Sequence, residues 1–176
     1  MAIIVEKSKL DGVLLIKPSI FNDHRGTYVE IFNIIDYNKN DIIIKFVRDD
    51  ISTSKKNVLR GIHYDKKTWK LIQCMHGKMF FVVVDMRTTS KQYLQWVSFD
   101  LDSIARNQVL VPPGFGNGHL VVSDECIFHY KMSEYYHPEN EQILRWDDPQ
   151  VNILWPIGNP ILSHKDETAP FLKVRK

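Results

Sequence analysis

Apolar and polar positions along this chain alternate in short runs, which is the pattern of β-strands. Residues 27–32 and 96–101 alternate with a period of two, as expected where successive side chains point to opposite faces. Residues 78–87 are aromatic or β-branched almost throughout and predict a strand buried on both faces. Further strands are predicted over residues 12–17, 41–48 and 108–111, and a hairpin over 120–123 and 126–131.

Turn signals separate these runs, and helical periodicity is weak. Pro112-Pro113-Gly114 predicts a turn, and we expect the loop to continue to His119 before the next strand begins. Short helices are predicted within residues 34–40 and in the last twenty residues. Many short strands at this spacing are typical of a β-sandwich or barrel. With no repeat or linker visible, we expect an all-β fold forming a single domain over residues 1–176.

Composition narrows the function classes. A chain of 176 residues can bury roughly 70% of its unfolded surface and needs no disulfide or metal for stability. Cys74 and Cys126 both fall in strand-like runs and are expected to fill the core, and low cysteine usage fits a reducing compartment. A net charge of +2 does not indicate a nucleic acid partner. Because no apolar run approaches a membrane span and no signal peptide is visible, we expect no membrane association and a cytoplasmic location.

Candidate chemistry gathers at Arg60, His63 and Lys70. A histidine can accept a proton near neutral pH, a lysine can stabilise an oxyanion, and an arginine can hold a phosphate. A lone histidine is more often structural, so the interpretation depends on these neighbours. Lys70 shares a strand face with the apolar Ile72 and Cys74, which is unusual for a lysine. Brought together by the fold, the three groups would form a proton-abstraction site for a phosphorylated carbonyl compound.

Strand alternation groups further candidates. Asn117 and His119 fall on one face of an extended segment. Phe128 and Tyr130 also share a face, opposite to that of His129 and its neighbour Lys131. Tyr130 is either a core aromatic residue or, if it faces a cavity, a phenol with an unperturbed pKa of about 10 that can donate a proton. Residues 162–166 supply the carboxylate of Asp166, although by themselves they could be a solvated surface segment.

An ordered set of segments resembles the dTDP-4-dehydrorhamnose 3,5-epimerases, which are cupin-fold enzymes acting on nucleotide-linked 4-keto-6-deoxy sugars. The set spans nearly the whole chain, and its order makes it far more specific than any one motif. The matching segments are Phe21-Asn22-Asp23-His24-Arg25-Gly26, Leu59-Arg60-Gly61-Ile62-His63-Tyr64, Lys70-Leu71-Ile72, Val84-Asp85-Met86-Arg87, Val111-Pro112-Pro113-Gly114-Phe115, Tyr130-Lys131, Tyr135-Tyr136, Pro138, Ile143-Leu144-Arg145-Trp146-Asp147-Asp148-Pro149, Trp155-Pro156, Leu162-Ser163 and Lys165-Asp166.

The resemblance implies a cupin-type jelly-roll barrel and four catalytic roles. His63 would be the base that removes the proton at C3 of the sugar, and Asp166 would pair with it. Lys70 would stabilise the enolate oxygen at C4, and Tyr130 would be the acid on the opposite face. No metal or other cofactor is expected, because the ketone of the substrate already activates the neighbouring carbon.

The resemblance also implies how the substrate, a nucleotide-diphosphate sugar, is held. Arg25 and Arg60 would bind the diphosphate, with Phe21 and Tyr136 near the sugar nucleotide. The remaining predicted substrate-binding residues are Glu30, Arg48, Asp50, Asn117 and His119. The resemblance further implies a homodimer whose chains exchange N-terminal strands, so some substrate contacts are expected from the partner chain.

Three departures from the family pattern bear on the substrate. Asn117 stands where the family has a histidine, and His119, two positions later, could substitute for it with a different reach. Arg48 and Asp50 stand where the family has neutral amides. The loop between His63 and Lys70 is short. These departures favour a different substrate, such as a GDP-linked 4-keto-6-deoxy hexose or heptose of capsule biosynthesis.

Several alternatives stay open at this point. A metal-dependent cupin usually presents a His-x-His pair, and so does a 3,4-ketoisomerase, whereas His63 is followed by Tyr64 and Asp65. A sugar-nucleotide binding module without activity would need no such set of titratable groups. The sequence does not decide between inversion at C3 alone and at both C3 and C5, nor does it fix the nucleobase or the length of the sugar.

Overall fold

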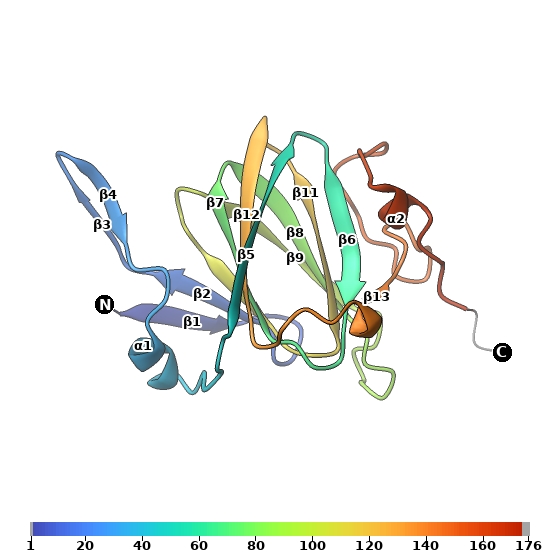
Figure 1. Ribbon diagram of the computed structural model, residues 1–176, viewed down its shortest axis with the longest axis horizontal. Helices are drawn as coiled ribbons and strands as arrows, with labels where there is room; N and C mark the ends of the chain where they lie inside the picture. Colours follow the sequence, from blue (N-terminus) through green and yellow to red (C-terminus); the bar gives the residue numbers. More distant parts are fainter. Residues whose placement is uncertain (1, 174–176) are drawn as a thin grey trace.

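The structure is a computed structural model that describes residues 2–173, and it consists mainly of two antiparallel β-sheets packed face to face (Figure 1). One sheet has six strands in the order β1-β2-β10-β7-β12-β5, and the other has five in the order β13-β6-β11-β8-β9. The strands of the six-stranded sheet are β1 (Ile3–Lys7), β2 (Leu14–Pro18), β5 (Arg48–Lys55), β7 (Lys70–His76), β10 (Gln108–Val111) and β12 (Glu125–Met132). Those of the five-stranded sheet are β6 (Leu59–Tyr64), β8 (Lys78–Asp85), β9 (Trp96–Asp102), β11 (Phe115–Val121) and β13 (Gln142–Ile143).

The sequence predictions hold for the most regular segments. The runs at 78–87, 96–101 and 108–111 form β8, β9 and β10, and β8 is buried along most of its length. Short helices occur where they were predicted, as α1 (Ile34–Asn38) and α2 (His164–Glu167), and a 3-10 turn covers Pro138–Asn140. The all-β prediction with short peripheral helices is confirmed.

The strand predicted over residues 41–48 is wrong. Residues 42–47 form an irregular connection, and β5 begins only at Arg48. The alternation there is real, because Ile42 is buried and Ile44 and Phe46 are partly buried in a cluster with Leu71 and others. This cluster lies on the outer side of the six-stranded sheet, since Leu71 alternates with inward-facing neighbours. A period of two therefore came from packing against a sheet and not from strand pairing.

The hairpin predicted across residues 120–131 is also wrong. β11 pairs with β6 and β8 in one sheet, whereas β12 pairs with β5 and β7 in the other. Residues 115–119, predicted as a loop, form the first part of β11. Their glycines reflect close packing, because a Cβ on Gly116 would lie 2.5 Å from a methyl group of Ile62.

The main hydrophobic cluster fills one part of the space between the two sheets. It includes Phe81, Phe115 and Phe128. Cys74 and Cys126 belong to the same cluster as free thiols with their sulfur atoms 3.6 Å apart, which agrees with the predicted core role. Apolar side chains therefore fill one part of the space between the two sheets, and the remaining part can hold polar side chains.

The hairpin of β3 (Ile20–Asp23) and β4 (Gly26–Val29) projects away from the two sheets (Figure 1). Phe21 and Tyr28 on this hairpin are both more than half exposed. The predicted strand at 27–32 is thus only half formed, because regular pairing ends at Val29. Over residues 2–173, none of the helices has the length and apolar character needed to cross a membrane.

Candidate active site

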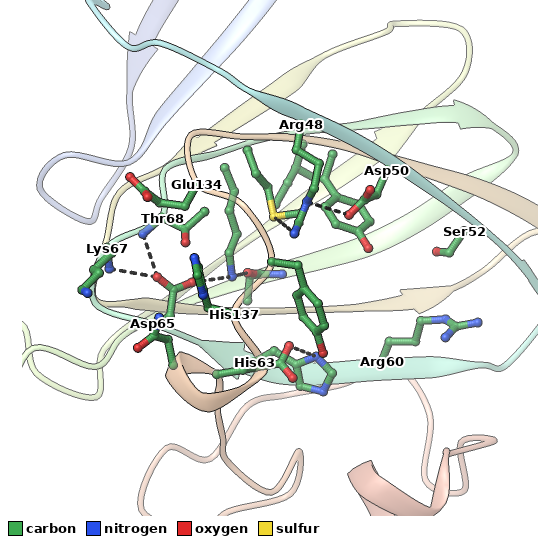
Figure 2. A pocket seen from close by; sticks show the side chains of 18 of the residues that line it. Arg48, Asp50, Ser52, Arg60, His63, Asp65, Lys67, Thr68, Glu134 and His137 are labelled. Carbon is green, nitrogen blue, oxygen red and sulfur yellow. Dashed lines mark hydrogen bonds and ion pairs between the residues drawn. The ribbon is translucent and has the colours of Figure 1, made fainter.

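A cavity of about 980 Å³ lies between the sheets, beyond the end of the main hydrophobic cluster. Strands β5, β7 and β12 line it from the six-stranded sheet, and β6 and β11 line it from the other. The rest of the wall comes from Asp65, Lys67 and Thr68 and from residues 134–137, 139–141, 163, 165 and 166. Figure 2 shows Arg60 and His63 along one strand, with Arg48 and Asp50 on the other side of the cavity in that view. The predicted residues that line this cavity are His63, Tyr130, Lys70, Asp166, Arg60, Arg48, Asp50, Asn117, His119 and Tyr136.

His63 is held by the carboxylate of Asp166. The Nε2 atom of His63 lies 2.6 Å from Oδ1 of Asp166, and the Ser163 hydroxyl donates to Oδ2 at 2.8 Å. Burial raises the pKa of Asp166, but hydrogen bonds from His63 and Ser163 outweigh it, so the pKa lies below its ordinary value. The ionised carboxylate can only accept, which places the ring proton on Nε2 and leaves Nδ1 as the free base.

A β-bulge brings Arg60 and His63 to the same side of β6. Residues three apart on a regular strand would face opposite sides of the sheet. Here His63 pairs with Asn117 and Arg60 with His119, so three steps along β6 match two steps along β11. Both side chains therefore reach the cavity. Alternation in the sequence gives no sign of this extra residue.

Lys70 lies within the cavity wall beside Asn117 and Asp65. Its Nζ atom donates to Oδ1 of Asn117 at 3.0 Å and lies 3.8 Å from Oδ2 of Asp65. Burial lowers the pKa of Lys70, while the Asp65 carboxylate acts in the opposite direction. The result is a largely desolvated amine with donor capacity directed into the cavity, as an oxyanion-stabilising group requires.

Tyr130 reaches the cavity from the opposite sheet to His63. Burial raises the pKa of its phenol, and the carboxylate of Asp50 raises it further. The phenol therefore stays protonated at neutral pH and can serve as an acid. The Tyr130 ring packs against Phe128 with centroids 5.0 Å apart, and this contact fixes the orientation of the phenol.

Glu141 is a cavity residue that the sequence prediction missed. Its Oε1 atom lies 3.7 Å from Nδ1 of His63, and its other carboxylate oxygen pairs with the amine of Lys165. The position follows from β13, since Ile143 pairs with His63 and draws the preceding residues onto the base. Glu141 precedes a two-residue strand in an irregular segment, so no periodicity could have signalled it.

Two arginines in the cavity have partners of their own. Nε of Arg48 lies 3.1 Å from Oδ2 of Asp50, and the Arg48 guanidinium lies 5.3 Å from the centroid of the Tyr136 ring. Arg60 donates from Nε to the Ser54 hydroxyl at 3.0 Å. The charged pair that replaces two neutral amides of the family thus faces the same space as the proton-transfer groups.

Three predicted binding residues lie elsewhere. Arg25 is exposed on the β3–β4 hairpin and pairs with Asp23 at 2.6 Å, and Phe21 lies on the same hairpin. Glu30 follows the hairpin and accepts a hydrogen bond from Asn33 at 3.2 Å. None of these three is among the described residues that line the cavity. They therefore do not contribute to the cavity of their own chain.

Metal ligation was the main alternative chemistry at this site. Across residues 2–173, we find no group of three or more His, Cys, Asp or Glu side chains that could hold a metal ion.

Comparisons with known proteins agree with the fold. The sequence profile of the dTDP-4-dehydrorhamnose 3,5-epimerase family matches residues 7–174. A dTDP-4-dehydrorhamnose 3,5-epimerase of Methanothermobacter thermautotrophicus is 39% identical over 165 residues, covering 91% of this chain and 89% of that protein.

Two solved structures extend the likeness to three dimensions. The dTDP-6-deoxy-D-glucose-3,5-epimerase of Legionella pneumophila, in complex with dTDP-4-keto-L-rhamnose, aligns with a TM-score of 0.92 at 37% identity, over 96% of this chain and 92% of that one. The dTDP-4-dehydrorhamnose 3,5-epimerase of Bacillus anthracis, with TDP and PPi bound, aligns with a TM-score of 0.94 at 34% identity, over 97% and 100%. The predicted cupin-type jelly roll is confirmed by these matches. This chain therefore belongs to the dTDP-4-dehydrorhamnose 3,5-epimerase family.

Proposed function

We propose that this protein is an epimerase that inverts C3, or both C3 and C5, of a nucleotide-diphosphate 4-keto-6-deoxy sugar. Family membership and the epimerase relatives support this reaction. The observation that carries the proposal is the convergence of His63, Lys70 and Tyr130 from two different sheets on one cavity. Inversion needs a base and an acid on opposite faces of the reacting carbon, and the two sheets supply one each.

The first step is removal of the C3 proton by Nδ1 of His63. The electron pair of the C3–H bond forms the C3–C4 double bond, and the ketone oxygen becomes an enolate. Asp166 stabilises the imidazolium through the hydrogen bond on Nε2. Lys70 donates to the developing oxyanion, and Asn117 holds the lysine amine in place.

The second step is return of a proton to the other face of C3. The Tyr130 phenol gives its proton to the enolate carbon, the ketone re-forms, and the phenolate is later reprotonated from solvent. The raised pKa of Tyr130 suits this role because the group is fully protonated at neutral pH. The same pair of groups could act at C5, which also adjoins the ketone.

The test is incubation of the protein in heavy water with dTDP- and GDP-linked 4-keto-6-deoxy sugars, followed by NMR. We expect deuterium at C3 or at C3 and C5, with inversion at the labelled carbon. The relatives described above are named for dTDP sugars, which makes the thymidine substrate the first to try. Movement of the ketone would instead reveal a 3,4-ketoisomerase, and the absence of exchange with every substrate would overturn the proposed reaction.

We further propose that the protein acts as a homodimer in which the β3–β4 hairpin of one chain reaches the cavity of its partner. The hairpin projects from its own sheets and exposes Phe21 and Tyr28, which is costly unless another surface covers them (Figure 1). The predicted diphosphate site needs Arg25 at a cavity, but Arg25 lies on this hairpin, outside the cavity of its own chain. Light scattering of the purified protein tests the oligomeric state, and a monomer at micromolar concentration would contradict the proposal.

A further inference from the structure

His119 lies at the floor of the cavity, where the polar wall meets the hydrophobic core. Its side chain is buried, and its ring stacks on Phe128 with centroids 4.2 Å apart and planes 9° from parallel. Phe128 belongs to the main hydrophobic cluster and also packs against Tyr130. The stack on Phe128 thus holds the imidazole in one orientation, and the same Phe128 ring contacts Tyr130, the proposed acid.

The Nε2 atom of His119 lacks a hydrogen-bond partner among the described residues, although it is completely buried. Leaving a buried polar atom unpaired destabilises the folded state, so native proteins retain such atoms mainly where a ligand or an ordered water completes them. The ring forms part of the cavity wall, so a bound group can reach the nitrogen once the surrounding side chains of the wall shift to admit it.

The electrostatic surroundings indicate which kind of group would pair with this nitrogen. Burial, together with the nearby Arg60 and His63, lowers the pKa of His119 to about 3. The ring is therefore neutral at working pH and cannot replace the family histidine as a cationic or proton-transferring group. A neutral imidazole nitrogen either donates or accepts according to its tautomer, and a hydroxyl group can satisfy both cases.

We propose that His119 is a specificity-determining residue whose Nε2 atom hydrogen-bonds to a hydroxyl group of the sugar ring. This inference rests on the proposed function, because it assigns a role within the same cavity. It also gives separate roles to Asn117 and His119: Asn117 orients Lys70 toward the ketone oxygen, and His119 recognises a hydroxyl elsewhere on the ring.

The test compares His119→Phe with the wild-type enzyme on the parent sugar nucleotide and on its 2-deoxy and 3-deoxy analogues, with deuterium uptake as the rate. Phenylalanine keeps the stack on Phe128 and removes the ring nitrogens. For the wild type, we expect kcat/KM to fall about tenfold or more with the analogue that lacks the recognised hydroxyl, because the histidine is then left unpaired. For His119→Phe, we expect a similar fall on the parent and no remaining discrimination between parent and analogue.

His129→Phe is the matched control. His129 also has a buried ring nitrogen without a partner among the described residues, but its other nitrogen pairs with Asp49, outside the cavity. We expect this variant to keep the discrimination of the wild type. Discrimination that persists in His119→Phe, or that is lost equally in His129→Phe, would overturn the assignment.

A binding measurement separates failure of this inference from failure of the proposed reaction. In protein labelled with 15N-histidine, the Nε2 resonance of His119 should move on addition of the sugar nucleotide and stay in place with the nucleoside diphosphate alone. This readout needs no turnover, so it stands even if no proton is exchanged. A resonance that does not move when the sugar nucleotide is bound would show that water or no group pairs with Nε2, and would overturn the proposal.

Discussion

The cavity and the β3–β4 hairpin differ in how completely one chain builds them. In the cavity, His63, Lys70 and Tyr130 have fixed partners and come from strands paired on both sides. On the hairpin, Arg25 is exposed, and among residues 2–173 it pairs only with its near neighbour Asp23. The proton-transfer groups and the predicted diphosphate ligand Arg25 therefore lie in separate parts of the molecule, although Arg60, the second predicted ligand, lines the cavity. The effects of varying His63 and Arg25 should accordingly separate.

The largest expected effect is that of His63→Asn. Loss of the base should reduce deuterium uptake at C3 by roughly 100- to 10,000-fold, the usual contribution of a positioned general base. Nucleotide binding, measured by calorimetry, should stay close to wild type because the diphosphate contacts are untouched. His129→Asn on the outer face of the same sandwich is the control, and full activity of His63→Asn would remove the base assignment.

Tyr130→Phe should divide the reaction into its two halves. Without the phenol, the enolate can form but cannot be protonated from the far face, so inversion should fall by about a hundredfold or more. Deuterium uptake with retained configuration should continue, because His63 and Lys70 are intact. NMR of the recovered sugar measures both quantities. Equal loss of exchange and inversion would show that Tyr130 is not the acid.

Arg25→Ala should weaken substrate binding with little effect on the proton-transfer step itself. Loss of one charge-assisted contact to a phosphate should raise KM by roughly tenfold or more. The hairpin of one chain serves the cavity of the other in the proposed dimer. Mixing equal amounts of Arg25→Ala and His63→Asn after reversible unfolding should therefore restore roughly a quarter of wild-type activity, since only mixed dimers contain one intact site. A mixture no more active than the sum of its parts would contradict a contact between chains.

The smallest expected effect concerns stability in acid. The pKa of Asp166 lies below its ordinary value, so its carboxylate stabilises the folded chain fully above about pH 4, and this contribution is lost as the pH falls through the folded-state pKa. Asp166→Asn should remove that part of the acid sensitivity. Since 1 kcal/mol moves Tm by roughly 2–4 °C in a domain of this size, calorimetry between pH 3 and pH 6 can measure it.

Asp23→Asn is the control for this stability measurement. Its pKa is also lowered, by Arg25, but the carboxylate is exposed on the hairpin, where solvent screens the interaction. We expect no measurable change in the pH dependence of Tm. An equal change in Asp23→Asn and Asp166→Asn would mean that the buried carboxylate has no special part in acid stability.

Where the sequence pattern predicted structure correctly, local properties were sufficient. The apolar run that forms β8 could only be a buried strand, and alternation correctly placed Phe128 with Tyr130 and His129 with Lys131. The pattern failed where side chains are buried without their backbone pairing in a sheet. Ile42 and its neighbours alternate because they cover a sheet, not because they join one.

The sequence by itself determined the β-rich class, the inward row of Lys70 with Ile72, and the chemical types of the candidate groups, because these follow from side-chain period and composition. Only the tertiary structure decided that β11 and β12 enter different sheets, that a bulge turns Arg60 and His63 to one side, and that Glu141 lies beside the base. The physical reason is that these features depend on contacts between residues far apart in the chain. A local period records which face is apolar, but it carries no information about which strand becomes the neighbour.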